Sequence, residues 1–260
     1  MLMAGSTYVV GDIHGHLRVL ERLLQQAHLI DDTLHWSGGE AVLWFIGDLV
    51  DRGPDSIAVV DFVMRLQAEA VLVGGSVDSL LGNHELLMLA AYRFGRRSTG
   101  LSSNFIIRWR RNGGMKSDLG KLTKEHLAWF AERPPLARIG NDLLVHADAT
   151  FYTRYGNSLT SVNDTFRNLF KHSDALAWEE LIEAFSMRGV FINTYAGEEF
   201  IDRFLTILGG RRIIHGHTPI STMIGGPARK VTEPYTYANG RCLNVDGGIY
   251  LGSSGFIHTL

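Results

Sequence analysis

Short apolar runs alternate along the chain with segments whose apolar residues recur every three or four positions. Thr7–Val10, Ala41–Ile46 and Asp142–Val145 are short and rich in bulky or β-branched residues, so they predict strands. Apolar residues at helical spacing predict helices over residues 17–27 and from Pro54 to Met64. This alternation is typical of an α/β fold.

The pattern is less regular in the middle of the chain. Val71–Val73 has the composition of a strand, but Gly74 interrupts it, and we predict a bulged or two-piece strand that continues to Leu81. Residues 95–120 are rich in Gly, Ser, Arg and Asn and predict irregular surface structure. Helical segments are predicted over Leu86–Phe94, from Thr123 to Pro134, and over most of 160–208, including Glu179–Phe185 and Glu198–Leu208. Further strands are predicted at 211–214, 242–245 and 255–258.

Composition narrows the class of protein. With 45% hydrophobic and 20% charged residues, the 260-residue chain is typical of a globular protein, and we expect one large domain over residues 1–260. A formal net charge of -2 gives no reason to expect binding to nucleic acid or membrane. The single cysteine, Cys242, excludes an internal disulfide and suits a reducing compartment. The sequence shows no signal peptide and no run of 18 apolar residues, so we expect a cytoplasmic protein.

Polar residues of the metal-binding type follow five of the apolar runs. They are Asp12, His14, Asp48, Asn83, His146 and His217. Because loops at the carboxyl ends of strands converge in open α/β sheets, we expect these side chains to meet in one crevice. Carboxylate, imidazole and amide ligands without sulfur suit Mn²⁺, Fe or Zn²⁺. Six ligands exceed the need of one tetrahedral zinc and favour two metals that share a carboxylate, so the sequence predicts a dinuclear metal hydrolase.

Three blocks of sequence make this prediction specific. Gly11–Gly15 (GDIHG), Gly47–Gly53 (GDLVDRG) and Gly82–Glu85 (GNHE) resemble, in order, the signature blocks of the phosphoprotein phosphatase family of calcineurin-like metallophosphoesterases. Val145–Asp148 and Gly216–Pro219 resemble the bacterial and phage branch, which includes the phage lambda protein phosphatase. Asn112–Gly114 (NGG) is a weaker match to the same branch. The resemblance implies an α/β/β/α fold, a central β-sandwich flanked by helices, with a single metallophosphoesterase catalytic domain.

The resemblance also implies a role for each residue of the blocks. Asp12, His14 and Asp48 would bind the first metal, and Asp48 would bridge to the second. Asn83, His146 and His217 would complete the second site, and Mn²⁺ would be the favoured ion, with Fe or Zn²⁺ as alternatives. A hydroxide bridging the metals would attack phosphorus. The remaining roles fall to four residues: Arg52 and Arg188 for binding phosphate, His84 for protonating the leaving oxygen, and Asp51 for orienting His84.

Several nearby polar residues have structural interpretations. We interpret His215 as a histidine that is structural or contacts a metal ligand, and Glu85 as a carboxylate at a helix start. Asp246 is interpreted as a turn residue, with contact to a metal ligand as the alternative. A basic cluster is either a solvated surface or a rim that steers a phosphorylated or polyphosphate substrate. It comprises Arg93, Arg96, Arg97, Arg108, Arg110, Arg111 and Lys116.

Three functions are compatible with these residues. The first is a serine/threonine phosphoprotein phosphatase that acts on a phosphorylated protein or a small phosphoester. The second is a bis(5'-nucleosyl)-tetraphosphatase on the same fold. Asp51 and Glu85 favour the phosphatase, because the symmetrical tetraphosphatases typically read Gly-Asn-His-Asp and lose the second aspartate. The third, a non-catalytic phosphate-binding module, is disfavoured because Asp48, Asn83, His84 and both late histidines are intact.

Overall fold

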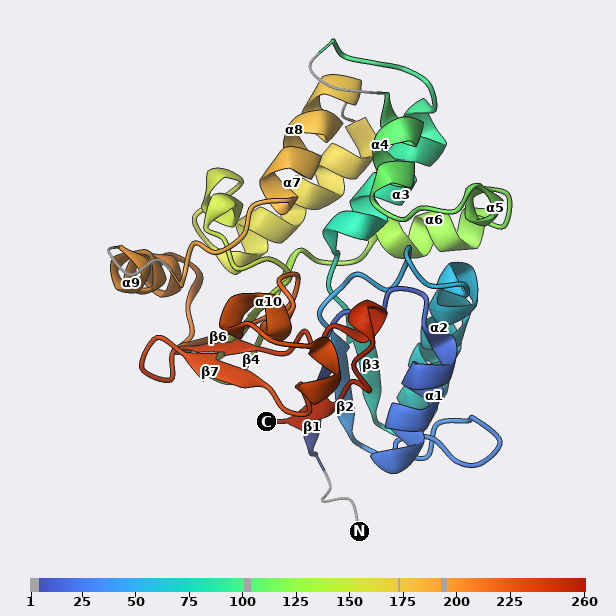
Figure 1. Ribbon diagram of the computed structural model, residues 1–260, viewed down its shortest axis with the longest axis vertical. Coiled ribbons are helices and arrows are strands. Elements are labelled where there is room, and N and C mark those ends of the chain that lie inside the picture. Colours follow the sequence, from blue (N-terminus) through green and yellow to red (C-terminus); the bar gives the residue numbers. More distant parts are fainter. Residues whose placement is uncertain (1–4, 101–103, 173, 193–195) are drawn as a thin grey trace.

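Two mixed β-sheets lie face to face in the computed structural model, which describes residues 5–100, 104–172, 174–192 and 196–260 (Figure 1). Predictions that fall on residues 1–4, 101–103, 173 and 193–195 lie outside the described residues. The first sheet has the order β3–β2–β1–β9, in which only β9 is antiparallel to its neighbour. Its strands are β1 (Thr7–Val10), β2 (Val42–Phe45), β3 (Ser76–Ser79) and β9 (Ile257–Thr259).

The second sheet has the order β4–β5–β6–β8–β7, with β5, β6 and β8 parallel and an antiparallel strand at each edge. Its strands are β4 (Leu136–Ile139), β5 (Asp142–Val145), β6 (Arg212–His215), β7 (Tyr235–Tyr237) and β8 (Cys242–Asn244). The sequence pattern did not predict β4 or β7, which are short edge strands.

Alternation of side chains along each strand makes the sandwich. Val9 packs between the sheets, whereas Val10 faces the helices on the outer side. The core between the sheets is formed by Val9, Ile46, Leu80, Ala137, Leu144, Ile214, Leu243 and Val245. Both faces of each sheet are therefore covered, as parallel strands require. The predicted central β-sandwich flanked by helices is confirmed.

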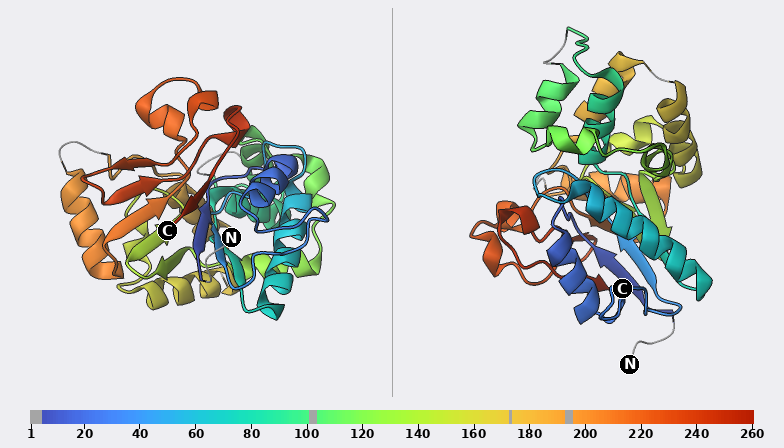
Figure 2. Two further views of the ribbon diagram at one scale, coloured as in Figure 1. Left: turned by 90° about the horizontal axis from the view of Figure 1, so that it is seen from below. Right: turned by 90° about the vertical axis from the view of Figure 1, so that its right-hand side faces the viewer.

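Helices cover the sandwich and extend beyond one end of it. α1 and α2 lie along the outer face of the first sheet, and α3, α4, α7 and α8 gather beyond the strand ends (Figures 1 and 2). The α-helices are α1 (Leu17–Gln26), α2 (Ser56–Leu72), α3 (Asn83–Phe94), α4 (Phe105–Arg111), α5 (Lys116–Leu119), α6 (Lys124–Ala131), α7 (Leu159–His172), α8 (Ala175–Phe185), α9 (Gly197–Leu208) and α10 (Ile220–Ile224). Short 3₁₀ helices span Phe151–Arg154, Ala228–Lys230 and Ile249–Leu251. Within the described ranges, no helix is long and apolar enough to cross a membrane.

The predicted strand at Val71–Val73 is wrong. Val71 and Leu72 form the last turn of α2, and they are 66% and 84% exposed. Gly74, at φ +83°, reverses the chain, and the N–H of Gly75 bonds to the carbonyl of Ala70 at 2.9 Å. These apolar residues extend the helix into solvent, so their composition resembles a strand although they have no sheet partner.

The prediction of irregular structure over residues 95–120 is also wrong in part, because α4 and α5 lie there. The side chain of Asn104 caps α4 by accepting a hydrogen bond from the N–H of Ile107 at 3.0 Å. Phe105 and Trp109, one turn apart, are its buried residues. With only two buried residues in seven, the helix carries too little apolar periodicity to be recognised.

Gly11 brings the two sheets together at the carboxyl ends of β1 and β8. A β-carbon at Gly11 would lie 2.1 Å from the carbonyl oxygen of Val245 and 3.0 Å from the Cα of Asp246. Only glycine allows the two backbones this close contact. The loop after β1 is therefore held against the loop after β8.

We predict that Gly11→Ala lowers the free energy of unfolding by about 1–3 kcal/mol, the usual cost of overpacking, because backbone has to move. Urea denaturation of the variant and wild type measures the loss. Gly120→Ala is the matched control, since among the described residues its added carbon meets only the carbonyl of Ser117, at an ordinary contact distance of 3.5 Å. Equal midpoints for the two variants would contradict the close contact.

Candidate active site

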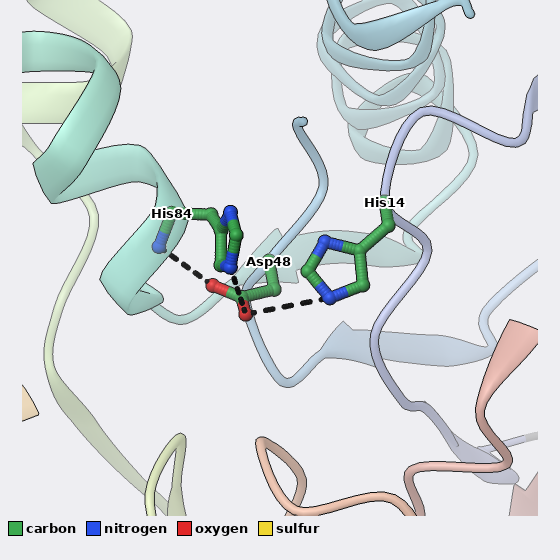
Figure 3. A group of neighbouring side chains, drawn as sticks. All are labelled: His14, Asp48 and His84. Carbon is green, nitrogen blue, oxygen red and sulfur yellow. Dashed lines mark hydrogen bonds and ion pairs between the residues drawn. The ribbon is translucent and has the colours of Figure 1, made fainter. Parts of the chain in front are cut away.

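The carboxylate of Asp48 lies at the centre of the predicted ligands, three residues beyond the end of β2. Its Oδ2 atom is 3.7 Å from Nε2 of His14 and 4.0 Å from Nε2 of His84 (Figure 3). Its Oδ1 atom accepts a hydrogen bond from the backbone N–H of His84 at 2.9 Å and lies 3.4 Å from Nε2 of His146. Asp48 thus faces imidazoles from the loop after β1, the start of α3 and the loop after β5.

Glu85 fixes the position of the Asp48 loop. This buried side chain, in the first turn of α3, accepts hydrogen bonds from the N–H groups of Asp48 at 2.9 Å, Leu49 at 2.8 Å and Gly82 at 2.8 Å. Burial, followed by repulsion from Asp48, raises the pKa of Glu85 to about 7. The sequence placed Glu85 correctly at a helix start, but it gave no sign that the carboxylate ties together two of the signature blocks.

Backbone strain gathers at the site. His14, Asp48, Asp51, Arg52 and His217 all have φ between +47° and +67°, the left-handed region that residues other than glycine rarely adopt. Each such residue costs about 1–2 kcal/mol. The fold tolerates this cost at the positions where the backbone turns polar side chains inward. Strained residues commonly cluster at functional sites in this way.

The first group of predicted ligands comes from the loops after β1 and β2. Nδ1 of His14 donates to the carbonyl of Val50 at 3.0 Å, so Nε2 is the nitrogen that faces Asp48. The same Nε2 lies 3.9 Å from Oδ2 of Asp12. Burial, with the neighbouring His84, holds the pKa of His14 well below its ordinary value. His14 is therefore neutral, the form in which an imidazole binds metal.

Asp12 is held in turn by the loop after β6. Both its oxygens lie 3.2 Å from the backbone N–H of His217, and a β-carbon on Gly216 would come within 2.2 Å of Oδ1. Burial raises the pKa of Asp12 well above its ordinary value, and repulsion from Asp246 and Asp48 adds to that effect.

In the second group, atoms that carry lone pairs point at one another. Oδ1 of Asn83 lies 3.0 Å from Nε2 of His146 and 2.8 Å from Nδ1 of His217. Nδ1 of His146 donates to the carbonyl of Ile46 at 2.8 Å, so its Nε2 has no hydrogen of its own unless the ring is charged. Two acceptors as close as Oδ1 of Asn83 and Nε2 of His146 need a proton or a cation between them, and these residues therefore fit a metal ion.

The pKa of His146 shows the same need for positive charge. Burial alone would lower it, but Asp48 outweighs that effect and raises the pKa to about 10. Conversely, burial alone would raise the pKa of Asp48, but His146 and His84 hold it well below its ordinary value. Without metal, a proton on His146 thus balances the carboxylate of Asp48.

Asp48 is common to two sets of side chains that could each hold an ion. His14, Asp48 and His84 form one set and Asp48, His146 and His217 the other, with the potential ligand atoms of each within 4.8 Å of one another. The first set includes His84, to which the sequence assigned another role. All are nitrogen and oxygen donors, which suit Mn²⁺, Fe or Zn²⁺. Asp12 and Asn83 lie beside these sets, so the structure brings all six predicted ligands together.

Asp51, Arg52 and His84 form a second layer around Asp48. Oδ2 of Asp51 accepts from Nδ1 of His84 at 2.9 Å, and Oδ1 accepts from the indole of Trp109 at 2.7 Å. Burial raises the pKa of Asp51. The guanidinium of Arg52 donates to Nε2 of His14 at 2.9 Å and of His84 at 3.0 Å.

Two aromatic residues that the sequence did not single out hold this layer. Trp109 anchors Asp51, and the ring of Tyr250 lies 3.9 Å from the guanidinium carbon of Arg52. The Asn-Gly-Gly segment at residues 112–114 supports both contacts. The N–H of Arg52 bonds to the carbonyl of Gly113 at 3.0 Å, and a β-carbon on Gly114 would collide with Trp109. That segment, a weak match in the sequence, was the available signal for this support.

Arg188 lies at the edge of the site. Its side chain is exposed, and its charge contributes, after burial and His146, to lowering the pKa of His217. Asp148 holds the segment that contains Arg188 in place. Its carboxylate accepts hydrogen bonds from the N–H of Gly189 at 2.7 Å and from the hydroxyl of Thr218 at 3.0 Å. His215 is buried and accepts from the hydroxyl of Tyr237 at 2.8 Å, in agreement with a structural role.

The fold and the donor set together define a metallophosphoesterase. Residues 5–221 match the Calcineurin-like phosphoesterase family, and the chain belongs to this family. The recognition made from the three signature blocks is confirmed, and similarity to Shewanella-like protein phosphatases supports the phosphoprotein phosphatase branch.

Curated relatives carry two different names. A symmetrical bis(5'-nucleosyl)-tetraphosphatase of Pectobacterium atrosepticum is 34% identical over 148 residues, which are 56% of this chain and 44% of the relative. Shewanella-like protein phosphatase 2 of Arabidopsis thaliana is 35% identical over 78 residues, 30% of this chain and 20% of the relative. The matches thus span less than half the length of these relatives.

Solved structures share the fold over the whole chain. A cold-active protein-tyrosine phosphatase of a psychrophilic Shewanella species has a TM-score of 0.72 at 20% identity, covering 99% of this chain and 76% of that one. A putative diadenosine tetraphosphatase has a TM-score of 0.55 at 17% identity, covering 99% and 94%.

We predict that Mn²⁺ binding at pH 7–8 releases at least one proton per protein molecule. Because the pKa of His146 is about 10, its ring is protonated at pH 7–8 in the metal-free protein. A metal ion binds only the neutral ring, so the proton has to leave. Apparent affinity should therefore rise with pH throughout this range. Calorimetric titration in two buffers of different ionisation enthalpy measures the release. Heats that do not depend on the buffer would contradict the charge assigned to His146.

Proposed function

We propose that the chain is a metal-dependent phosphomonoesterase that hydrolyses phosphoserine and phosphothreonine in proteins. The observation that carries the proposal is the buried pair of Asp51 and His84, whose Oδ2 and Nδ1 atoms are 2.9 Å apart. The carboxylate accepts a hydrogen bond from Nδ1 and thereby orients the ring so that Nε2 faces the site. This is the arrangement of a general acid.

The need for a general acid depends on the leaving group. A serine or threonine alkoxide is a poor leaving group and requires a proton in the transition state, whereas a nucleotide phosphate leaves readily without one. A chain that held His84 only as a structural residue would not need a carboxylate buried behind it, with Trp109 donating to its other oxygen. The pair therefore favours alkoxide leaving groups over phosphoanhydrides.

Arg52 would bind the phosphoryl group. Its planar guanidinium suits two phosphate oxygens, and the ring of Tyr250 limits its movement. Asp12, His14 and Asp48 would hold one divalent ion, and Asp48, Asn83, His146 and His217 a second, with Mn²⁺ favoured. Bound there, the ions would activate water and neutralise charge on the phosphoryl oxygens. A cation at Nε2 of His14 would replace the Arg52 contact, so that Arg52 can turn to phosphate.

A second candidate is hydrolysis of dinucleoside tetraphosphates. It is favoured by the relatives that carry that name and by the basic residues Arg110 and Arg111, which are exposed and precede the Gly113 contact with Arg52. A polyphosphate would gain more from such a rim than a single phosphate. This candidate predicts a substrate preference rather than a different site.

A substrate comparison distinguishes the two. The purified protein, loaded with Mn²⁺, would be assayed on phosphoserine, phosphothreonine and phosphotyrosine peptides and on diadenosine tetraphosphate. The proposal predicts the highest kcat/KM on phosphoserine or phosphothreonine. A clear preference for the dinucleotide would reject it in favour of the second candidate, and a phosphotyrosine preference would reject the serine/threonine assignment.

We predict that His84→Asn slows phosphoserine-peptide hydrolysis by about 10²–10⁴-fold, the usual contribution of a positioned acid. Turnover of p-nitrophenyl phosphate should suffer much less, because nitrophenolate leaves without a proton. Steady-state kinetics on both substrates, with metal content measured in parallel, tests this.

His258→Asn, on the edge strand β9, serves as the control and should leave both rates unchanged. An equal slowing of both substrates by His84→Asn, with metal content preserved, would mean that His84 is not the acid.

A further inference from the structure

The two oxygens of the buried Asp246 carboxylate lie in different surroundings. It follows β8 by two residues and is fully buried. Oδ1 accepts a hydrogen bond from the N–H of Gly248 at 2.8 Å, which accounts for the predicted turn. Oδ2 has no hydrogen-bond partner among the described residues. An isolated buried anion is costly, so this oxygen requires an explanation.

The position of Asp246 places it against the first group of predicted ligands. Gly11 contacts the backbone of Asp246, because a β-carbon on Gly11 would lie 3.0 Å from the Cα of Asp246. Asp12 is the next residue along the loop that contains Gly11. Among the charged side chains that shift the pKa of Asp246, Asp48 has the largest effect and Arg52 the next. Among those that shift the pKa of Asp12, Asp246 has the largest effect. Three carboxylates, of Asp12, Asp48 and Asp246, thus share one end of the sandwich.

A turn alone does not need this group. The hydrogen bond from Gly248 uses one oxygen, and an asparagine would supply the same acceptor. What aspartate adds is a second oxygen and a negative charge, next to a carboxylate that already repels it. The arrangement is favourable only if positive charge joins these groups.

We propose that Asp246 is a positioning residue of the first metal site, where Oδ2 supplies negative charge and a hydrogen-bond acceptor to the bound ion's surroundings. This inference rests on the metal site of the proposed function and adds a residue to it. Residues beside the direct ligands typically change metal affinity by about 10–100-fold. Asp246 should therefore act on metal affinity rather than on the fold.

Asp246→Asn tests the proposal, because it keeps the acceptor for Gly248 and removes the charge. We expect the metal-free variant to melt at the same temperature as wild type or higher, since a repulsive anion is gone. Its affinity for Mn²⁺, measured by calorimetry, should fall by about 10–100-fold. The rise in melting temperature that Mn²⁺ produces should shrink accordingly. A residue needed only for the turn would not combine a stable metal-free state with weak metal binding.

Asp118→Asn is a matched control. Asp118 in α5 is also fully buried, and neither of its carboxylate oxygens has a hydrogen bond to a residue that the structure describes. Unlike the segments at the site, α5 carries none of the predicted ligands. This variant should bind Mn²⁺ like wild type. If Asp246→Asn does not fold, Asp246→Ser, whose hydroxyl can accept from Gly248, decides the matter by the same titration.

Unchanged Mn²⁺ affinity in a folded Asp246 variant would overturn the inference and leave the proposed function intact. Wild-type protein that binds no Mn²⁺ at all would instead reject the metal site of the proposed function, and the inference with it. The titration thus separates the two failures.

Discussion

The buried charge of Asp48 is the constraint on which the site depends. Its carboxylate is 1% exposed and lies near the buried carboxylates of Asp12, Asp246 and Glu85. Such a concentration of acidic groups in a protein interior is unfavourable without compensating charge. The surrounding imidazoles provide part of it, with His146 protonated in the absence of metal. A bound cation would provide the rest, and this explains why nitrogen and oxygen donors from two sheets converge on one carboxylate.

The sandwich makes this convergence possible. An apolar layer between the sheets fixes the strands, and the parallel strands of both sheets end on the same side of it. The glycines at 11 and 216 permit backbone contacts and approaches that any side chain would block. Glu85 then joins the loop after β2 to the start of α3 through three N–H groups. The strained backbone at His14, Asp48 and His217 is tolerated because these contacts stabilise the loops in the strained conformation.

Polar residues in short sequence blocks could be predicted from the sequence as potential metal ligands. The structure brings together Asp12, His14, Asp48, Asn83, His146 and His217. Residues that act through packing could not be predicted in this way. Trp109 lies in a helix of only seven residues, which is too short to show a clear helical periodicity, and Tyr250 contacts Arg52 across about 200 positions of the chain. Asp246 was interpreted as a turn residue because its turn is local, whereas its neighbours Asp12 and Asp48 are distant in sequence. Edge strands such as β7 were missed because three residues carry no recognisable alternation.

The central proposal is that two metal ions would share the carboxylate of Asp48. Anomalous X-ray diffraction from crystals of the Mn²⁺-loaded protein, recorded at the manganese edge, tests it most directly. The account predicts two anomalous peaks about 3.5–4 Å apart, each within bonding distance of an Asp48 oxygen, one toward His14 and the other toward His146. A single peak, or two peaks of which only one contacts Asp48, would contradict it.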